Sequence, residues 1–288
     1  MTTSLRALHR AVQAQHNARF TTDWLARPPY SHFHPAFCAA AATLSDWPEP
    51  DQYGALVAAV PQAAGQELPR FVLQDRAALA EAGGYEQHVA ALRAVPTRPR
   101  HWHDFFNMAV WAHFPAARWA LNELHVDARL GPKDPRNGRA PQQNVVAQFD
   151  ESGLIVTSTS ASLLSDLRAL RFKRVFWERR AELLETTRFW LIGHGTLESL
   201  LAPHLGLACK ALLMVVSSAP DSVALPPSDA FRHEVDARAA QSIRSWRAGA
   251  PMLDPVPVLG IPGFAANEFG EFYDDARYFR FQRRGERS

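Results

Sequence analysis

Apolar residues recur every three or four positions in several parts of the chain, which is the spacing of a helix with one buried face. Residues 5–12 follow this spacing, and so do residues 85–93. From Asp104 onward the same pattern continues for several turns. Pro115 interrupts it, and because proline is disfavoured inside a helix, we expect a new helix or a kink there.

The middle of the chain mixes helical and extended signals. Residues 144–156 predict two extended segments joined by a turn at Gly153, with a helix up to Asp150 as the competing interpretation. Residues 165–185 predict a helix, and residues 189–201 continue the helical character.

The remaining segments complete the expected fold. Residues 130–142 are rich in Gly, Pro and Asn and predict a loop, whereas residues 207–216 form a short apolar run that fits a strand or a buried helix equally well. Residues 229–246 predict a helix, and the proline-rich residues 251–264 predict extended chain. We find no internal repeat and no linker, so residues 1–288 are expected to form a single, mainly helical α+β domain with a few short strands.

Composition agrees with a folded chain and narrows its partners. The chain has 288 residues, of which 47% are hydrophobic, and this is ample for a buried core. Lys and Arg (31) nearly balance Asp and Glu (29), for a formal net charge of +2. Because the charges balance, no strong positive field points to nucleic acid as a partner.

Cysteine content and hydropathy predict that the protein is located in the cytoplasm. The two cysteines, Cys38 and Cys209, lie far apart and outside any CxxC arrangement, so the sequence indicates a reducing compartment. Polar residues interrupt the first 20 positions, which is unlike a signal peptide. Residues 211–216 are the most apolar segment and fall far short of the roughly 20 residues that cross a bilayer.

Several common catalytic signatures are missing from the sequence. It contains no GxGxxG, GxxxxGK[ST], GxSxG or HExxH motif and no EF-hand loop. The most frequent dinucleotide, P-loop, serine-hydrolase, zincin and calcium sites are therefore not expected.

Residues 100–107, RHWHDFFN, contain the highest density of polar side chains that can take part in catalysis. Asp104 at a helix start fits an ordinary N-cap residue, whose carboxylate accepts backbone N–H groups. Capping does not account for His103, nor for Asn107, which lies one turn later and should project from the same side as Asp104. We therefore consider His103, Asp104 and Asn107 candidate catalytic residues.

Two further segments carry candidate residues. If residues 192–198 are helical, His194 and Glu198 stand four positions apart, about 5–6 Å at Cβ, which suits a shared metal or a carboxylate that orients an imidazole. A surface pair beside small packing residues is the alternative. Asp150 and Glu151 are adjacent carboxylates at the expected turn, either solvated or serving as a cation ligand or general base.

These segments together resemble a bacterial family of unknown function, DUF3025. The resemblance spans roughly residues 30–280 and rests on spaced motifs: YEQHV at 85–89, VPTR at 95–98, HDFFN at 103–107, FDESG at 149–153, GH at 193–194 and LGIPG at 259–263. One departure is visible, because Gln142-Gln143 stands where the family pattern has an Arg-Asp pair. The family brings no known activity, so the resemblance supports the choice of segments only.

Two functional hypotheses follow. In the first, the chain is a hydrolase-type enzyme whose His103, Asp104, His194 and Glu198 converge, with a divalent zinc, manganese or iron ion held by these four residues or with a metal-free His–carboxylate pair. Such a site would take a small-molecule ligand.

Arginine side chains add to this hypothesis. Arg98 and Arg100 stand beside the candidate residues and could hold an anionic group of the substrate.

The second hypothesis is a non-catalytic binding or adaptor protein. It would use an aromatic and proline-rich surface that includes Trp102, Phe105, Phe106 and residues 255–264.

Overall fold

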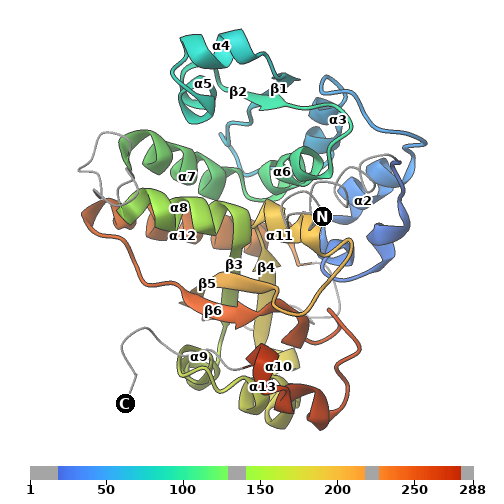
Figure 1. Cartoon of the computed structure of the whole chain (residues 1–288), viewed down its shortest axis with the longest axis vertical. Coiled ribbons are helices and arrows are strands. Elements are labelled where there is room, and N and C mark those ends of the chain that lie inside the picture. The colour runs from blue at the N-terminus through green and yellow to red at the C-terminus, as the bar shows by residue number, and fades with distance from the viewer. Residues whose placement is uncertain (1–18, 129–140, 218–226, 280–288) are drawn as a thin grey trace, which may run out of the picture.

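A layer of helices lies between two sheets of unequal size. The computed structural model describes residues 19–128, 141–217 and 227–279. Figure 1 shows the small sheet with α4 and α5 at one end, helices α6, α7, α8 and α12 across the middle, and the larger sheet below them. Helix predominates over strand, so the predicted mainly helical α+β class is confirmed. The expected helix at residues 5–12 and most of the loop at 130–142 lie outside the described residues.

The larger sheet has four strands in the order β4-β3-β5-β6. Its strands are β3 (Gly153–Ser158), β4 (Thr187–Leu191), β5 (Ala208–Val215) and β6 (Asp254–Pro257). β3 pairs antiparallel with β4 and parallel with β5, and β5 pairs antiparallel with β6. The two prolines of β6 are tolerated because this strand lies at the edge of the sheet. The small sheet is one parallel pair, β1 (Arg70–Leu73) and β2 (Ala94–Thr97).

The α-helices of the described residues lie between these sheets and at the two ends of the molecule (Figure 1). They are α2 (Pro35–Ala42), α3 (Tyr53–Ala58), α4 (Arg76–Glu81), α5 (Tyr85–Leu92), α6 (Trp102–His113), α7 (Pro115–Ala128), α8 (Pro141–Ser152), α9 (Ala161–Arg168), α10 (Arg180–Thr186), α11 (His194–Ser199), α12 (Asp229–Ser245) and α13 (Ala276–Phe279). α7 packs against α8 and α12, whereas α11 packs against α6 and α8. The predictions of helices at 85–93 and 229–246 are confirmed.

Helix α6 is buried nearly all round, as its apolar residues on every face require. Trp102, Phe105 and Phe106 are at most 3% exposed. They stack on, or meet edge to face with, an aromatic cluster that includes Trp24. The adaptor hypothesis requires these three aromatic residues at the surface, but they belong to the hydrophobic core.

A new helix begins at Pro115, one of the two outcomes expected there. The carboxylate of Asp236 on α12 accepts hydrogen bonds from the backbone N–H groups of Ala116 and Ala117, at 2.9 and 2.8 Å. Because the first N–H groups of a helix have no partner within the helix, this carboxylate from another helix stabilises the start of α7.

The extended interpretation of residues 144–150 is wrong, and the competing helix is correct. α8 runs to Ser152, and strand β3 begins at Gly153. Val146 and Phe149, three positions apart, are both buried, so their spacing belongs to one helical face.

Two long predicted helices are shorter or broken. Residues 187–191 form strand β4, whose residues are all buried, and an apolar run buried on both faces has no period that separates strand from helix. Residues 165–185 contain α9, a π-helical turn (Arg174–Glu178) and α10. The break follows α9, where Leu170 adopts a left-handed conformation with φ of 60°. The apolar run at 207–216 is strand β5.

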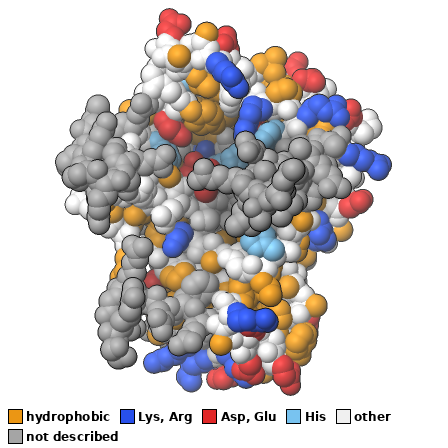
Figure 2. Space-filling view, in the orientation of Figure 1, with side chains coloured by type: hydrophobic (Ala, Val, Ile, Leu, Met, Phe, Trp, Pro, Cys, Tyr) orange, Lys and Arg blue, Asp and Glu red, His pale blue; other side chains and the backbone are white. Residues whose placement is uncertain are grey.

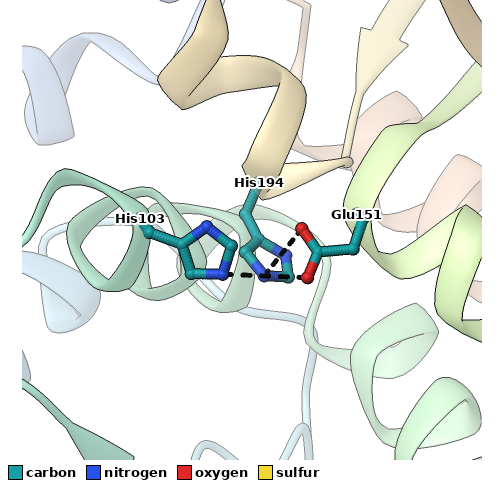
Figure 3. Close-up of side chains that lie close together, drawn as sticks. All are labelled: His103, Glu151 and His194. Atoms are coloured by element: carbon teal, nitrogen blue, oxygen red, sulfur yellow. Dashed lines mark ion pairs between the residues drawn. The ribbon is translucent and has the colours of Figure 1, made fainter. Parts of the chain in front are cut away.

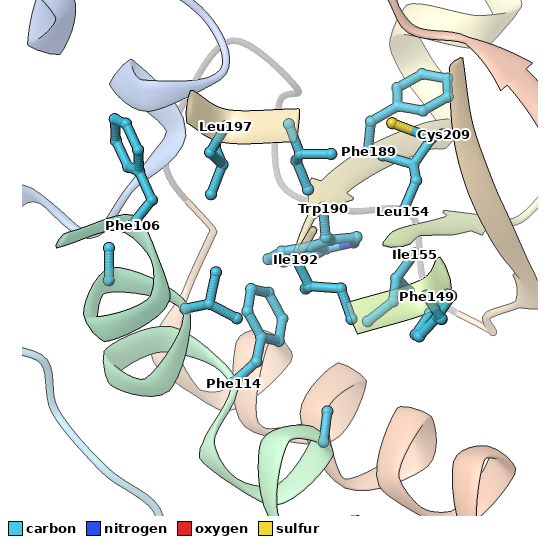
Figure 4. Packing of buried hydrophobic residues seen from close by; sticks show 14 of the residues in the cluster. Phe106, Phe114, Phe149, Leu154, Ile155, Phe189, Trp190, Ile192, Leu197 and Cys209 are labelled. Carbon is cyan, nitrogen blue, oxygen red and sulfur yellow. The ribbon is translucent and has the colours of Figure 1, made fainter. Parts of the chain in front are cut away.

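One connected cluster of buried hydrophobic residues extends from Phe20 to Tyr278. Figure 4 shows part of it, where Phe106 and Phe114 face Leu197, Ile192 and the sheet. The cluster joins α6, α11 and the sheet into one packed unit, so their relative positions are fixed by core packing.

Charged side chains of both signs cover the periphery of the face in Figure 2, in line with the nearly balanced composition. Within the described ranges, no helix combines the length and the apolar character that crossing a membrane requires.

Two glycines join the helical layer to the sheet. The carbonyl oxygen of Gly153 accepts hydrogen bonds from the N–H groups of Ile192 and Gly193, at 3.0 and 2.8 Å. A Cβ on Gly193 would lie 2.5 Å from the backbone nitrogen of Gly153 and from Cα of Ser152. Gly193 has a φ of −73°, which any residue can adopt, so the requirement for glycine is spatial.

We predict that Gly193→Ala destabilises the fold, because the backbone of Ser152 and Gly153 leaves no room for a methyl group. Overpacking of this kind costs about 1–3 kcal/mol, so the melting temperature should fall by roughly 2–10 °C in thermal unfolding followed by circular dichroism. Gly54→Ala is the matched control, since Gly54 lies in α3 with nothing within 4 Å of the added Cβ, and this change should be neutral or stabilising. Equal melting temperatures for the two variants would contradict the spatial requirement.

Candidate functional site

Three elements bring their polar side chains to one point. His103 extends from the first turn of α6, Glu151 from the end of α8, and His194 is the first residue of α11 (Figure 3). The two imidazole rings lie 4.3 Å apart between centroids. The predicted convergence of His103 and His194 in one pocket is therefore confirmed.

Both imidazoles turn the same nitrogen toward Glu151. Nε2 of His103 lies 3.8 Å from Oε1, and Nε2 of His194 lies 3.9 Å from Oε2. One ligand atom from each of the three residues falls within a mutual distance of 4.8 Å. Two imidazole nitrogens and a carboxylate at this separation can hold one divalent transition-metal ion.

The opposite nitrogens face other carboxylates. Nδ1 of His103 donates to Oε2 of Glu198 at 3.2 Å, so the neutral ring carries its lone pair on Nε2. Nδ1 of His194 lies 3.8 Å from Oδ1 of Asp150. Glu198 therefore pairs with His103 rather than with His194, four positions earlier on the same helix.

The two imidazoles differ in their affinity for a proton. Burial opposes protonation of His103, but the hydrogen bond to Glu198 and the charge of Glu151 outweigh it, so its pKa is raised above 6.5. Burial lowers the pKa of His194 well below 6.5, and the neighbouring charges of His103 and Arg118 lower it further. His194 is thus a neutral imidazole at pH 7, with a lone pair available to a ligand.

Asp104 has a different role from the expected one. It is neither the N-cap residue, which is His101, nor a neighbour of Glu151 in the three-residue group. Its carboxylate accepts three hydrogen bonds from Arg98: from the backbone N–H at 2.6 Å, from Nε at 3.0 Å and from Nη2 at 2.6 Å. These bonds direct the carboxylate toward Arg98, and Asp104 is not one of the three residues whose ligand atoms lie close together.

The two candidate substrate-binding arginines separate in space. Arg98 lines the same cavity as His103 and His194. Arg100 instead pairs with exposed Asp46 at 3.4 Å, and it does not line that cavity. Arg100 adopts a positive φ of 54°, which turns the chain just before α6. The structure does not bring Arg100 to the site.

Asn107 belongs to the site through a chain of hydrogen bonds. Its Oδ1 accepts from Nη2 of Arg118 at 2.9 Å, and its Nδ2 donates to the hydroxyl of Tyr85 at 3.0 Å. Asn107 therefore shares the cavity with Asp104, as its spacing predicted, but it contacts different partners.

Asp150 is the buried centre of a second group. Its Oδ1 forms an ion pair with Nη1 of Arg118, and its Oδ2 lies 3.7 Å from Nε2 of His125. Glu86, His125 and Asp150 also have the spacing of a cation site. Arg118 already compensates Asp150 there, so a metal ion in this second position would be placed beside a guanidinium cation.

Sequence reasoning did not select Tyr85, Glu86, Arg118 or His125, which all belong to these networks. A signal for part of the set exists on α7. Arg118 and His125 stand seven positions apart and therefore share a face of an otherwise largely apolar helix. Polar side chains on the buried face of a helix need hydrogen-bond or ion-pair partners, and here these partners lie on α5, α6 and α8.

The described residues enclose a cavity of about 230 Å³ beside the three-residue group. Its charged lining consists of four carboxylates and two guanidinium groups, from Glu86, Asp104, Asp150, Glu151, Arg98 and Arg118. With neutral imidazoles the lining carries two more negative than positive charges. The cavity therefore favours a divalent cation.

We predict that Glu198→Gln lowers the pKa of His103, because the neutral amide no longer stabilises the imidazolium ion. NMR titration of the imidazole ¹⁵N resonances of metal-free protein measures this directly. Glu234→Gln is the control, since Glu234 pairs with Arg238 on the exposed face of α12.

The raised pKa of His103 also makes the stability of the fold depend on pH. Because the folded pKa of His103 lies above 6.5, protonation stabilises the fold below pH 6.5, and this contribution is lost as the pH rises through the folded value. A His103 pKa at or below 6.5 in the wild-type protein would contradict this account of the site.

Comparison with known proteins identifies the family and nothing beyond it. The family model described as "Protein of unknown function (DUF3025)" matches residues 69–283. No curated protein matches the chain, and no solved structure does. The match covers most of the sequence and includes His103, Glu151 and His194. The chain therefore belongs to the DUF3025 family, as its motifs predicted.

Proposed function

We propose that the protein is a metal-dependent hydrolase that holds one divalent ion (zinc, manganese or iron) through Nε2 of His103, Nε2 of His194 and the carboxylate of Glu151. One observation carries the proposal. Both Nε2 atoms face the same carboxylate, while both Nδ1 atoms face a further carboxylate, Glu198 or Asp150. Ligating histidines in proteins are oriented by such partners on the other ring nitrogen.

The distances suit a metal centre after a small contraction. Ligand atoms that each lie about 2.0–2.2 Å from one ion are separated from each other by roughly 3.0–3.6 Å. The two N···O distances are 3.8 and 3.9 Å. Glu151 is half-exposed, so its carboxylate has the freedom to close this difference.

Charge gives independent support. Arg98 pairs with Asp104 and Arg118 pairs with Asp150, whereas among the described residues Glu151 forms no ion pair with an arginine or lysine and faces only the two imidazoles. A divalent ion would compensate Glu151 and the excess negative charge of the cavity.

Three protein ligands leave coordination positions open for water and substrate. A divalent ion bound there would supply a hydroxide nucleophile near neutral pH and would polarise a carbonyl or phosphoryl oxygen. Glu151 would bind the ion through one carboxylate oxygen, and its other oxygen would accept the proton of the attacking water. A small molecule would enter the cavity of about 230 Å³.

A cytoplasmic site of action is part of this proposal. Cys38 and Cys209 are free thiols, as expected in a reducing compartment. The alternative of an adaptor protein has less support, because three of the residues that it requires at the surface, Trp102, Phe105 and Phe106, are buried.

The metal is tested first. Protein purified without chelator should contain close to one equivalent of a transition metal by elemental analysis, and His194→Ala should lose most of it, because one of three ligands is gone. Glu198→Gln should keep the site but weaken metal affinity about 10- to 100-fold. His204→Ala is the control, since His204 is exposed and outside the cavity.

Asp104→Asn separates this ligand set from the one that the sequence suggested. Asp104 bonds to Arg98, so its loss should leave the metal content unchanged. A wild-type protein that binds neither zinc, manganese nor iron would reject the metal site and leave a metal-free His103–Glu198 acid–base pair.

Hydrolysis is tested separately with p-nitrophenyl acetate. Metal-stripped protein should hydrolyse it at the buffer rate, and added Zn²⁺ should restore a rate that falls about tenfold or more in Glu151→Gln. The release of p-nitrophenolate measures the rate, with His204→Ala as the unaffected control. A zinc-loaded protein that gives the buffer rate would speak against a hydrolase of activated esters and leave a metal-binding protein.

A further inference from the structure

The cavity contains one hydrogen-bond donor whose direction is fixed by its neighbours. Arginine can only donate, so Nη2 of Arg118 makes Oδ1 of Asn107 the acceptor at 2.9 Å. The amide orientation is thereby set, and Nδ2 must donate to the Tyr85 hydroxyl oxygen at 3.0 Å. The hydroxyl hydrogen of Tyr85 then has to point to some other acceptor.

No such acceptor is present among the residues that the structure describes. Tyr85 lines the cavity together with Asn107 and Arg118, so the space into which its hydrogen can point is the cavity. Burial raises the pKa of Tyr85, and the hydroxyl therefore stays protonated as a donor. A hydroxyl hydrogen without an acceptor at this partly buried position is unfavourable, which favours a ligand that supplies one.

The donor lies about one helical turn from the candidate metal position. His103 and Asn107 stand four positions apart on α6 and share a face, at about 5–6 Å between Cβ atoms. Tyr85, on α5, contacts Asn107 and therefore lies about one helical turn along α6 from His103. A ligand held at His103 and Tyr85 would therefore bridge two points about one turn apart.

We infer that Tyr85 is a substrate-binding residue that donates a hydrogen bond to a carbonyl or similar uncharged oxygen of the substrate, a few atoms from the group bound at the metal. Asn107 and Arg118 act as positioning residues, because they fix the direction of that donor. The inference rests on the proposed metal site. An uncharged oxygen is favoured over a second anionic group, because the lining is already acidic.

The test uses Co²⁺-loaded protein and two probes of equal length, levulinate and pentanoate. Both bring a carboxylate to the metal, and only levulinate carries a ketone oxygen further along the chain. Titration followed by the visible absorption of Co²⁺ gives each affinity. The wild-type protein should prefer levulinate about two- to tenfold, the usual range for one neutral hydrogen bond.

Tyr85→Phe should remove this preference and leave the affinity for pentanoate unchanged. Tyr53→Phe is the matched control, because Tyr53 is buried on α3, its hydroxyl has no hydrogen-bond partner among the described residues, and it does not line the cavity. An unchanged Co²⁺ spectrum confirms that each variant is folded around the metal.

The outcomes distinguish the two proposals. A Tyr85→Phe protein that still prefers levulinate, or a wild-type protein that binds Co²⁺ but shows no preference, overturns the role of Tyr85 alone. A wild-type protein that binds no Co²⁺ overturns both the metal site and the inference that rests on it.

Discussion

The close approach of Gly153 and Gly193 is the constraint on which the site depends. The carbonyl of Gly153 accepts two backbone hydrogen bonds from residues 192–193, and a side chain on Gly193 would collide with backbone. This contact brings the end of α8 to the start of α11, and thus Glu151 to His194. The Tyr30 hydroxyl donates to the carbonyl of Leu197 at 2.6 Å and ties α11 to the aromatic cluster around α6, which carries His103.

The pairing of charges distinguishes Glu151 from the other carboxylates of the site. Two of the carboxylates near the imidazoles are compensated by guanidinium groups, since Asp104 pairs with Arg98 and Asp150 with Arg118. Glu151 alone faces the two Nε2 atoms. Asp104 and Asp150 are therefore paired with arginines, whereas among the described residues no arginine or lysine forms an ion pair with Glu151, and we place the proposed cation between Glu151 and the two imidazoles.

Sequence periodicity predicted most of the long helices, but it did not distinguish the short buried strand β4 from a helix. α5, α12 and the break at Pro115 were predictable, whereas β4 was taken for helix because both of its faces are buried. His103 and His194 could be selected from residue type and local spacing. Glu151 was also a candidate from the sequence, but its position opposite both imidazoles could not be predicted, because α6, α8 and α11 meet only through the packing of segments far apart in the sequence.

Zinc K-edge X-ray absorption of protein loaded with one equivalent of Zn²⁺ tests the central claim most directly, because it reports the identity and distance of the ligand atoms. The account predicts a first shell of nitrogen and oxygen at about 2.0–2.2 Å that includes two imidazoles. It also predicts that His103→Ala and His194→Ala each remove one imidazole from that shell. Zinc that fails to bind, or a shell in which neither variant changes the imidazole count, would contradict it.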